Sequence, residues 1–567
     1  MRFITLHADY INFKPLKKAI KSIELKKGEE LEKKIEESLV ILTAVEKGDT
    51  IELIKKFVGE IKAIAKQVKA ENIVIYPYAH LSSNLSSPDI AQEFLEQAQK
   101  ELKKDFKLVE KAPFGFYKEF EIKVKGHPLS ELSREFKSEE KGNKITEEKY
   151  DEKQLLREIS KSKLDTSKLK ENDHRILGQK MDLFSFHDVA PGMVFWHNNG
   201  LTIYNELINY WRELHKKNNY QEISTPQIMD EKLWKISGHW EKYKENIFLT
   251  DYEKRKFAVK PMNCPGGMLV YKSSSKSYKD LPLRIGELGV VHRQELSGVL
   301  SGLFRVIKFT QDDAHIFCTE KQVESEIQEI IKLIDKTYNL FGFEYHVELS
   351  TRPEKRIGDD KIWDKAETIL EKTIKKQKMK CKINKGDGAF YGPKIDFHIK
   401  DSLGRTWQMA TIQLDFAMPE RFELEYIDEK SKPQRPIILH RVIFGSIERF
   451  IGILLEHTNG QLPTWLSPIQ VRVINFTDRS NKYAEEIIKK IKSEIPNIRI
   501  DNDFDSVPLN GKIRNAEIMK IPYIIVVGDK EEKEKTIALR KRGQKQIEQK
   551  SIEEFIKNIQ EEIKDRK

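Results

Sequence analysis

The sequence predicts a multidomain chain that joins α/β and α+β domains. Its 567 residues exceed what one hydrophobic core usually organises, so we expect about three to four domains. Two composition changes mark boundaries: a charged stretch with almost no aromatic residues begins near residue 134, and PTWLSP carries two prolines at 463–468. We therefore predict domains at 1–135, 176–466 and 467–567, with a charged linker at 136–175.

Composition restricts the class of protein. The hydrophobic fraction of 39% supports packed cores, and the net charge of +10 is a mild basic excess that favours polyanion binding. The three cysteines (Cys264, Cys318 and Cys381) are too few for a disulfide framework, which indicates a reducing compartment. No apolar run approaches membrane-spanning length, and the N-terminus lacks a signal-peptide pattern. We expect a cytoplasmic protein without membrane contact.

The N-terminal region alternates strand and helix patterns and is typical of a compact α/β domain. In chain order we expect strands at 2–13 and 36–49, a helix at 51–70, a strand at 71–79, a helix at 86–105 and a closing hairpin at 114–128. The helix at 86–105 begins with Ser-Pro-Asp, which is a helix start signal.

The central and C-terminal regions differ in their strand patterns. The central region predicts a helix at 204–220, a strand-like piece ended by Pro226, a long hairpin of 281–293 with 304–317, and antiparallel strands at 388–401, 405–416 and 436–444. After PTWLSP, strands and helices alternate again, as in a small α/β domain. Its strands are expected at 469–476, 497–503, 521–530 and 536–543.

Three residues, Cys264, His315 and His440, predict a metal centre. One thiolate and two imidazoles form an incomplete tetrahedral set for zinc, and the open fourth position would let the metal contact a substrate. Their long spacings match no local zinc-finger pattern. On spacing alone, Cys264 is equally well a small buried apolar residue. Likewise His440 fits a core or surface histidine, and His315 fits a hydrogen-bonded partner of the nearby aspartates.

A second group of residues indicates nucleotide binding. Arg293 and Arg305 lie on the predicted hairpin with Phe309, and Arg449 lies in a helix that begins at Ser446. Arginine offers a fixed fork of donors for phosphate and a planar face for stacking on a base. Each arginine alone is more often part of a surface ion pair. The apolar face of the helix is formed by Ile447, Phe450, Ile451 and Leu454, which leaves Arg449 off that face.

These elements, in this order, resemble motifs 1, 2 and 3 of the class II aminoacyl-tRNA synthetases. SGHW, KPMNCPGG, FTQDDAHIFC, GAFYGPKIDF, TIQLDFAMPERF and HRVIFGSIERFIG narrow the resemblance to threonyl-tRNA synthetases over roughly residues 173–567. LHADY, YPYAHLSSNL, APFGFYKEF and GHPLSELSR resemble the editing domain of the archaeal-type enzymes. The resemblance implies an antiparallel class II catalytic core, an N-terminal domain like D-aminoacyl-tRNA deacylases, and an α/β anticodon-binding domain.

The resemblance also implies roles for individual residues. For ATP, the resemblance implies that Arg293 binds the α-phosphate and Arg305 the terminal phosphates. Adenine would be bound by Glu295, Phe309 and Arg449. The other residues implied to bind ATP or the adenylate are Gln311, Lys394, Gln408, Met262 and Ser446. Tyr391, Asp313 and Gln413 would bind threonine, and His239 would relay a proton during transfer to tRNA. HRQE stands where the family usually has HRNE, and CPGG where many members have CPGH. Neither change removes a ligand or a phosphate contact.

The implied zinc has a selective purpose. Threonine and valine are nearly isosteric, and a site that binds the hydroxyl can reject valine by roughly 10⁴-fold or more. Serine keeps the hydroxyl and lacks only a methyl, which is worth only about 10–200-fold, so hydrolytic editing of seryl-tRNA is expected. The editing candidates are His80, Lys118, Tyr117 and Glu131. Without the resemblance, Lys118 fits a solvated strand lysine and His80 a turn-capping residue.

Partners follow from the same resemblance. Glu531 and Arg540 would contact anticodon bases of threonine tRNA, and a further contact falls near Ser506, where relatives often have an amide or acid. We expect ATP with Mg²⁺, L-threonine, and a homodimer formed through the first motif. Two rivals remain: a prolyl or seryl class II enzyme, and a non-catalytic RNA-binding paralogue.

Overall fold

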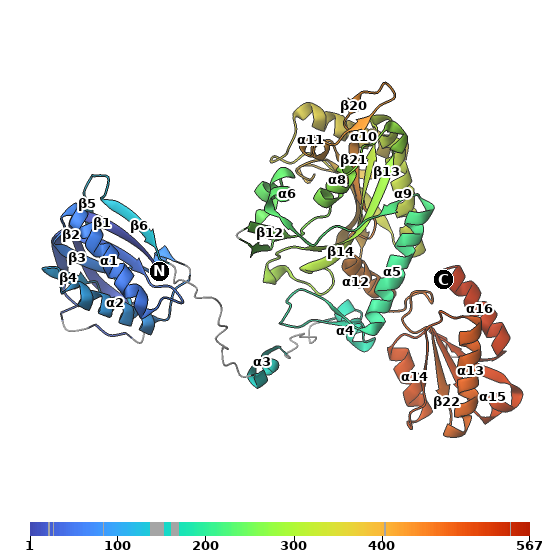
Figure 1. Cartoon of the computed structure of the whole chain (residues 1–567). Coiled ribbons are helices and arrows are strands. Elements are labelled where there is room, and N and C mark those ends of the chain that lie inside the picture. Colours follow the sequence, from blue (N-terminus) through green and yellow to red (C-terminus); the bar gives the residue numbers. More distant parts are fainter. Residues whose placement is uncertain are drawn as a thin grey trace. The chain divides into compact units, whose positions relative to one another are not determined.

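The computed structural model describes the chain except for residues 21–22, 26–27, 83, 137–151, 160–168, 254, 402–403 and 545. It divides into two compact units, Met1–Tyr150 and Asp151–Lys567 (Figure 1). Much of the predicted linker lies outside the described residues, which show within it the helix α3 (Glu152–Ile159). Among the described helices, none is both long and apolar enough to cross a membrane.

The first unit is a six-stranded sheet with two helices. Its elements are β1 (Arg2–Lys18), β2 (Lys33–Ala44), α1 (Ile51–Val68), β3 (Asn72–Pro77), η1 (Ala79–Leu81), α2 (Pro88–Leu102), β4 (Leu108–Lys111), β5 (Phe116–Val124) and β6 (Glu131–Glu135). The strand order is β4-β3-β2-β1-β5, and β6 also pairs with β1. Ile41 of β2 packs with Phe57 of α1 and Leu95 of α2, because strand and helix spacing each bring apolar side chains to one face.

The expected closing hairpin at 114–128 is wrong. This segment forms a single strand, β5, which pairs with one end of β1 (Pro15↔Lys118), while β6 pairs with the other end (Leu6↔Glu131). The long β1 has an edge that both short strands can share, so β5 and β6 bond to β1 rather than folding back on each other. The other strands and both helices predicted in this region are confirmed, with β4 and β6 as additions.

An eight-stranded sheet forms the core of the second unit, in the order β16-β15-β17-β18-β21-β14-β13-β9. Its strands are β9 (Gln221–Glu222), β13 (Leu283–His292), β14 (Lys308–Cys318), β15 (Tyr345–Ser350), β16 (Cys381–Asn384), β17 (Lys394–Lys400), β18 (Thr406–Asp415) and β21 (Ile437–Val442). All neighbours are antiparallel except the edge pairs β15–β16 and β13–β9. The predicted long hairpin is confirmed as β13 and β14, and the three further predicted strands as β17, β18 and β21.

Helices and short strands surround this sheet. The helices are α4 (His174–Lys180), α5 (Asn198–Lys217), α6 (Glu231–Ile236), α7 (His239–Tyr243), α8 (Cys264–Lys272), α9 (Val323–Leu340), α10 (Asp360–Lys376), α11 (Ala417–Arg421) and α12 (Ile447–Thr458). The short strands are β7 (Phe184–Ser185), β8 (Phe195–Trp196), β10 (Ile228–Asp230), β11 (Leu249–Tyr252), β12 (Arg255–Val259), β19 (Tyr426–Ile427) and β20 (Pro433–Gln434). One large apolar cluster joins α5, α9, α10 and α12 to the sheet.

The start of α12 shows how sequence fixes the local structure. Gly445 has φ +74°, and a Cβ there would lie 2.8 Å from the Met409 carbonyl oxygen, so only glycine fits this turn without strain. The Ser446 hydroxyl then caps the helix by accepting from the Arg449 N–H at 3.1 Å. The predicted apolar face is confirmed, since Ile447, Phe450, Ile451 and Leu454 are all buried.

The C-terminal part of the second unit is a five-stranded sheet in the order β23-β22-β24-β25-β26. Its elements are β22 (Val471–Asn475), α13 (Asn481–Glu494), β23 (Ile500–Asp503), α14 (Leu509–Ile518), β24 (Tyr523–Val527), α15 (Asp529–Glu534), β25 (Thr536–Lys541), β26 (Ile547–Ser551) and α16 (Ile552–Lys564). The two-proline segment before it is packed rather than exposed: Leu466 is fully buried, and the Trp465 ring lies 6.1 Å from that of Phe341.

Removing the Phe450 ring of α12 should destabilise the packing of this helix on the eight-stranded sheet. Phe450 is fully buried and contacts the rings of Phe341 and Phe444. We expect Phe450→Ala to lower the free energy of unfolding by about 3–5 kcal/mol. Tryptophan fluorescence during urea unfolding reports this region, because every tryptophan lies between residues 173 and 466. The control is Tyr252→Ala, at a ring that is 64% exposed; equal loss in both variants would contradict the packing argument.

Candidate active site and metal centre

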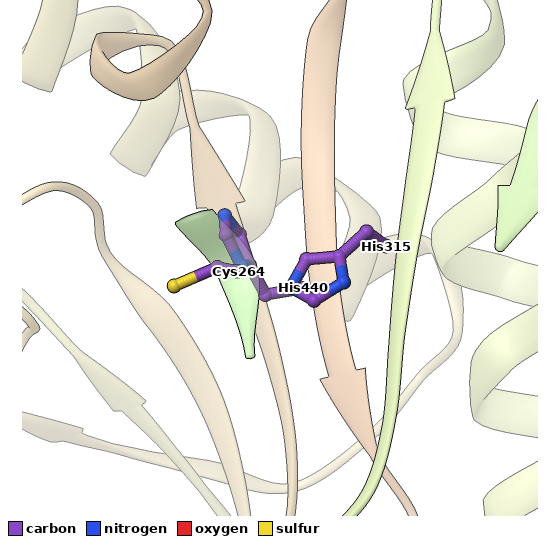
Figure 2. Close-up of side chains that lie close together, drawn as sticks. All are labelled: Cys264, His315 and His440. Carbon is purple, nitrogen blue, oxygen red and sulfur yellow. The ribbon is translucent and has the colours of Figure 1, made fainter. Parts of the chain in front are cut away.

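Three elements bring Cys264, His315 and His440 together (Figure 2). Cys264 begins α8, whereas His315 of β14 and His440 of β21 are direct partners across the sheet. All three are buried, and one ligand atom from each lies within 4.8 Å of the others. The two imidazole rings are 4.8 Å apart and nearly perpendicular. Residues separated by 51 and 125 positions therefore form one cluster, which the sequence spacing alone did not establish.

The donor set fits a metal ion such as zinc. The His315 Nε2 atom is buried and makes no hydrogen bond in the structure, and leaving such an atom unpaired is costly. The Asp415 carboxylate lies 2.9 Å from His440 Nε2, which leaves the other ring nitrogen as the ligand atom. Burial lowers the pKa of His315 to about 4, so the ring is neutral and able to ligate. Burial, with Asp313 and Asp415, raises the pKa of the Cys264 thiol, which a bound cation would reverse.

Polar side chains that can hold a small zwitterion surround the cluster. Asp313 precedes His315 by two residues on the same face of β14, with Oδ2 3.9 Å from His315 Nε2. Asn263 donates to Asp313 Oδ2 at 3.1 Å and so fixes the carboxylate. The Tyr391 ring lies 5.2 Å from that of His440, whose cross-strand partner on β18 is Gln413. The predicted threonine-binding residues therefore all adjoin the metal donors.

A polar cavity of about 360 Å³ is lined by Gln311, which lies two residues before Asp313 on the same face of β14. The predicted residues that line it are Arg293, Glu295, Arg305, Phe309, Gln311, Gln408, Ser446 and Arg449. The Arg293 guanidinium stacks over Phe309 at 5.1 Å, so Phe309 already has one cation on its ring. Burial and the charges of Arg293 and Arg305 lower the pKa of Arg449 to about 10. Three crowded guanidiniums repel one another, and a polyphosphate would relieve that repulsion.

Lys394, His239 and Met262 lie outside the lining of this cavity. Lys394 forms an ion pair with Asp396 at 2.8 Å, and Gln408 donates to the same carboxylate at 2.6 Å. His239 is fully buried, with Nδ1 2.8 Å from the Ser237 hydroxyl and Nε2 2.9 Å from Met262 Sδ. Burial, with His440 and Arg293 as the next causes, lowers the pKa of His239 to about 3, so the ring is neutral.

Sequence reasoning missed several residues of the site. Tyr243 and Thr411 line the polar cavity, Asp396 joins Lys394 to Gln408, and Asp415 supports His440. Asp415 had a usable signal, because it follows Gln413 by two residues on one strand and must share its face. Tyr243 ends the short helix α7, and no sequence pattern connected it with the strands that line the same cavity.

The first unit has a cavity of its own, of about 520 Å³ and largely apolar. His80, Tyr117 and Lys118 line it, whereas Glu131 does not. Lys118 donates to the carbonyl oxygens of Pro113 at 2.9 Å and Phe116 at 3.1 Å, and burial lowers its pKa to about 8. Glu131 pairs with Leu6, eleven residues along β1 from the partner of Tyr117, about 36 Å at strand spacing. Glu131 is therefore distant from Tyr117 along β1 and outside the cavity that Tyr117 lines, and its editing role stays a prediction.

The predicted anticodon residues lie on the C-terminal sheet and its adjoining helix. Glu531 caps α15 by accepting from the Gly528 N–H at 3.0 Å, and it also accepts from Gln549 at 2.9 Å. Arg540 of β25 forms an ion pair with Glu517 of α14. Ser506 is exposed in the loop between β23 and α14.

Comparison with known proteins finds similarity in three separate parts of the chain. Three family models match: the archaea-specific editing domain of threonyl-tRNA synthetase over residues 1–136, the tRNA synthetase class II core domain (G, H, P, S and T) over 243–458, and an anticodon binding domain over 470–562. The predicted fold class is confirmed. At 16% identity and a TM-score of 0.55, prolyl-tRNA synthetase from Cryptosporidium parvum shares the fold over 72% of this chain and 80% of its own.

Relatives of higher sequence identity are named threonine–tRNA ligases. The threonine–tRNA ligase of Clostridium botulinum (strain 657) is 45% identical over 539 residues, 91% of this chain and 82% of the relative. That of Desulforamulus reducens is 53% identical over 397 residues, 70% of this chain. This chain spans only 62% of the length of the latter relative. The RNA binding domain of threonyl-tRNA synthetase from Cryptosporidium parvum matches with a TM-score of 0.66 and 39% identity, covering 69% of this chain and 98% of its own.

Metal content tests the donor set directly. We expect about one Zn²⁺ per chain after purification with zinc, and less than about 0.1 in Cys264→Ser or His315→Gln, because each change removes one of three protein ligands. Elemental analysis by mass spectrometry measures this. Cys381→Ser, at a cysteine outside the cluster, is the matched control. Equal metal content in all four proteins would contradict the site.

Proposed function

This chain belongs to the threonyl-tRNA synthetases, and we propose that it joins L-threonine to threonine tRNA at the expense of ATP, through threonyl-adenylate. The observation that carries the proposal is one row on β14. Phe309, Gln311, Asp313 and His315 alternate along the strand and so share one face. The row runs from the nucleotide cavity to the metal donors over about 20 Å at strand spacing, which is long enough for an aminoacyl-adenylate.

The charges in the cavity support adenylate formation. An oxygen of the threonine carboxylate attacks the α-phosphorus of ATP, and the bond to pyrophosphate breaks. Arg293, Arg305 and Arg449 offset the phosphate charge, and Mg²⁺ bound with ATP neutralises the leaving group. In the second step, a ribose hydroxyl of tRNA attacks the acyl carbon and AMP leaves. His239 is neutral, and its low pKa means that a proton taken up by the ring is readily released. This property suits it to relay a proton during the transfer to tRNA.

Selection of threonine would take place at the metal donors. A Zn²⁺ held by Cys264, His315 and His440 would supply Lewis-acid binding of the substrate's amino and hydroxyl groups. Asp313, held by Asn263, accepts a hydrogen bond from one of these groups, and Tyr391, whose ring lies 5.2 Å from that of His440, contacts the same substrate. Because valine lacks the hydroxyl, it would leave these buried polar groups unpaired.

The remaining partners follow from family membership. We propose that Glu531 and Arg540 contact anticodon bases, that the protein works as a cytoplasmic homodimer, and that the functional domains span 1–135, 176–466 and 467–567. A prolyl or seryl specificity is disfavoured because the thiol and both imidazoles converge. A non-catalytic paralogue is disfavoured because all three motif arginines line one cavity.

A second proposed activity is hydrolysis of seryl-tRNA in the first unit. The apolar cavity there admits an acyl-adenosine end, and Lys118 extends into it with two of its three protons donated to backbone carbonyls. The third proton is free to orient the ester carbonyl or the attacking water, with His80 at the rim. The position of Glu131 gives no support to its role within the same unit.

Amino-acid-dependent pyrophosphate exchange tests the first activity. We expect exchange with threonine and a preference over valine of roughly 10⁴-fold or more. Asp313→Ala should lower kcat/KM for threonine by about 10–100-fold, because it removes a charged hydrogen-bond partner. The control is Asp251→Ala, at an exposed residue of β11. Exchange that proline or serine supports better than threonine would assign the chain to another specificity.

Deacylation assays with seryl-tRNA test the second activity. Lys118→Met should leave threonine charging unchanged and raise the accumulation of seryl-tRNA by at least about 10-fold, since a donated hydrogen bond to the reacting ester is lost. The nearby Lys123→Met, on the same strand but not lining the cavity, is the control.

The pH dependence of deacylation gives a further check on Lys118. Because its pKa is about 8, the ammonium form decreases as pH rises through 8. Hydrolysis above the uncatalysed rate should therefore fall between about pH 7 and 9 in the wild type. A wild-type rate that instead rises over this range would indicate that Lys118 acts as a neutral base.

A further inference from the structure

A buried histidine outside both cavities joins three elements of the catalytic core. His174 begins α4 and is 1% exposed. Its Nδ1 lies 2.7 Å from the Glu456 carboxylate of α12, and its Nε2 accepts from the Leu303 N–H at 3.0 Å. An amide N–H can donate only to an unprotonated nitrogen, so the ring is neutral and carries its proton on Nδ1.

The cluster of Asp173, His174 and Glu456 resembles a metal site in composition but not in bonding. Asp173 Oδ1 accepts from the backbone and side chain of Arg175, both at 2.9 Å. Both ring nitrogens of His174 already have partners, unlike Nε2 of His315 in the metal centre. These atoms are occupied by protein hydrogen bonds, which indicates a role in holding the backbone.

The segment that His174 holds is the turn before β14. Gly302 has φ +49°, and a Cβ there would lie 2.2 Å from His174 Nε2, so the backbone packs directly on the ring. The His174 and Phe304 rings are 4.3 Å apart. Phe304 and its neighbour Arg305 line the nucleotide cavity. A shift of this turn would therefore move an arginine proposed to bind phosphate.

Helix α12 also contacts this turn directly. Arg449, Gly452 and Glu456 lie at i, i+3 and i+7, on one face of the helix. Arg449 Nε donates to the Phe304 carbonyl at 2.8 Å. At Gly452, an added Cβ would lie 3.0 Å from the Phe304 ring, so the turn packs closely against the helix there. Glu456 completes the row by holding His174.

We propose that His174 is a positioning residue for nucleotide binding. Its ring couples Glu456 to the Leu303 amide and so sets the turn that presents Arg305 and the Phe304 carbonyl to the cavity. This inference rests on the proposed function, since it takes ATP as the ligand. Removing the hydrogen bond to Leu303 should weaken ATP binding while leaving the metal centre and threonine binding unaffected.

Two substitutions separate the two hydrogen bonds. The amide of glutamine reaches about as far as Nε2, so His174→Gln keeps an acceptor for the Leu303 N–H. The amide of asparagine stops near Nδ1, so His174→Asn keeps only the bond to Glu456. We expect His174→Asn to raise KM for ATP about 10-fold in pyrophosphate exchange, and His174→Gln less than about 3-fold. KM for threonine and zinc content should not change in either variant.

Hydrogen exchange of the ligand-free protein gives a readout that does not depend on activity. The amides of residues 296–304 should exchange faster in His174→Asn than in His174→Gln or the wild type, because Leu303 loses its acceptor. His457→Asn, at the exposed histidine next to Glu456, is the matched control and should match the wild type in both measurements.

Two outcomes would overturn the inference. One is an unchanged KM for ATP and unchanged exchange in His174→Asn. The other is an equal change in KM for ATP, KM for threonine and thermal stability in both variants, which indicates a packing role only. Failure of the proposed function is distinguishable, because the wild type would then show no threonine-dependent exchange, whereas the hydrogen-exchange comparison would still report on the turn.

Discussion

The register of β14 against its two neighbours is the constraint on which the site depends. Its pairing with β21 places His315 opposite His440, and its pairing with β13 runs without a register shift over the whole row from Phe309 to His315. Asp312, on the opposite face, accepts from the N–H groups of Ile443 and Phe444 at 2.8 and 3.0 Å. One face of β14 therefore carries the proposed recognition groups. On its other face, Asp312 holds the backbone of the residues that precede α12.

Charge is distributed between these faces in opposite ways. On the substrate side, three guanidiniums share a cavity, which favours an anionic ligand. On the core side, burial raises the pKa of Asp312 and of Glu448 to about 7 each, and both carboxylates accept backbone N–H groups. Asp312 and Glu448 therefore serve the backbone, whereas Glu295, in the cavity itself, forms an ion pair with Arg305 at 3.1 Å. Because Asp312 and Glu448 accept backbone N–H groups on the core side, these two buried carboxylates need not offset the positive charge of the arginines in the cavity.

Most of the fold could be predicted from local sequence patterns. The predictions that were wrong concern features that depend on the pairing of strands distant in sequence. The amphipathic face of α12 and the hairpin of β13 with β14 were predictable, because residue spacing encodes them. Glu131 was predicted as an editing residue together with Tyr117, but their pairing partners lie at different ends of β1, which no local pattern encodes. The metal site of Cys264, His315 and His440 could be predicted only from the family resemblance, because their spacing in the sequence does not indicate that they lie close together. Asp415 and Asp396 were missed, and His174 was not assigned a role, because each acts through a neighbour that only the tertiary structure supplies.

The alternation along β14 has an evolutionary consequence. Because neighbouring residues face opposite sides, inserting or deleting one residue within this strand would turn the recognition row inward and bring Asp312 and Ala314 out. Substitutions at single positions change one contact, whereas a length change exchanges both faces at once. Single substitutions can thus change the chemistry of the strand stepwise, whereas a one-residue change in its length exchanges the faces of all residues beyond that point.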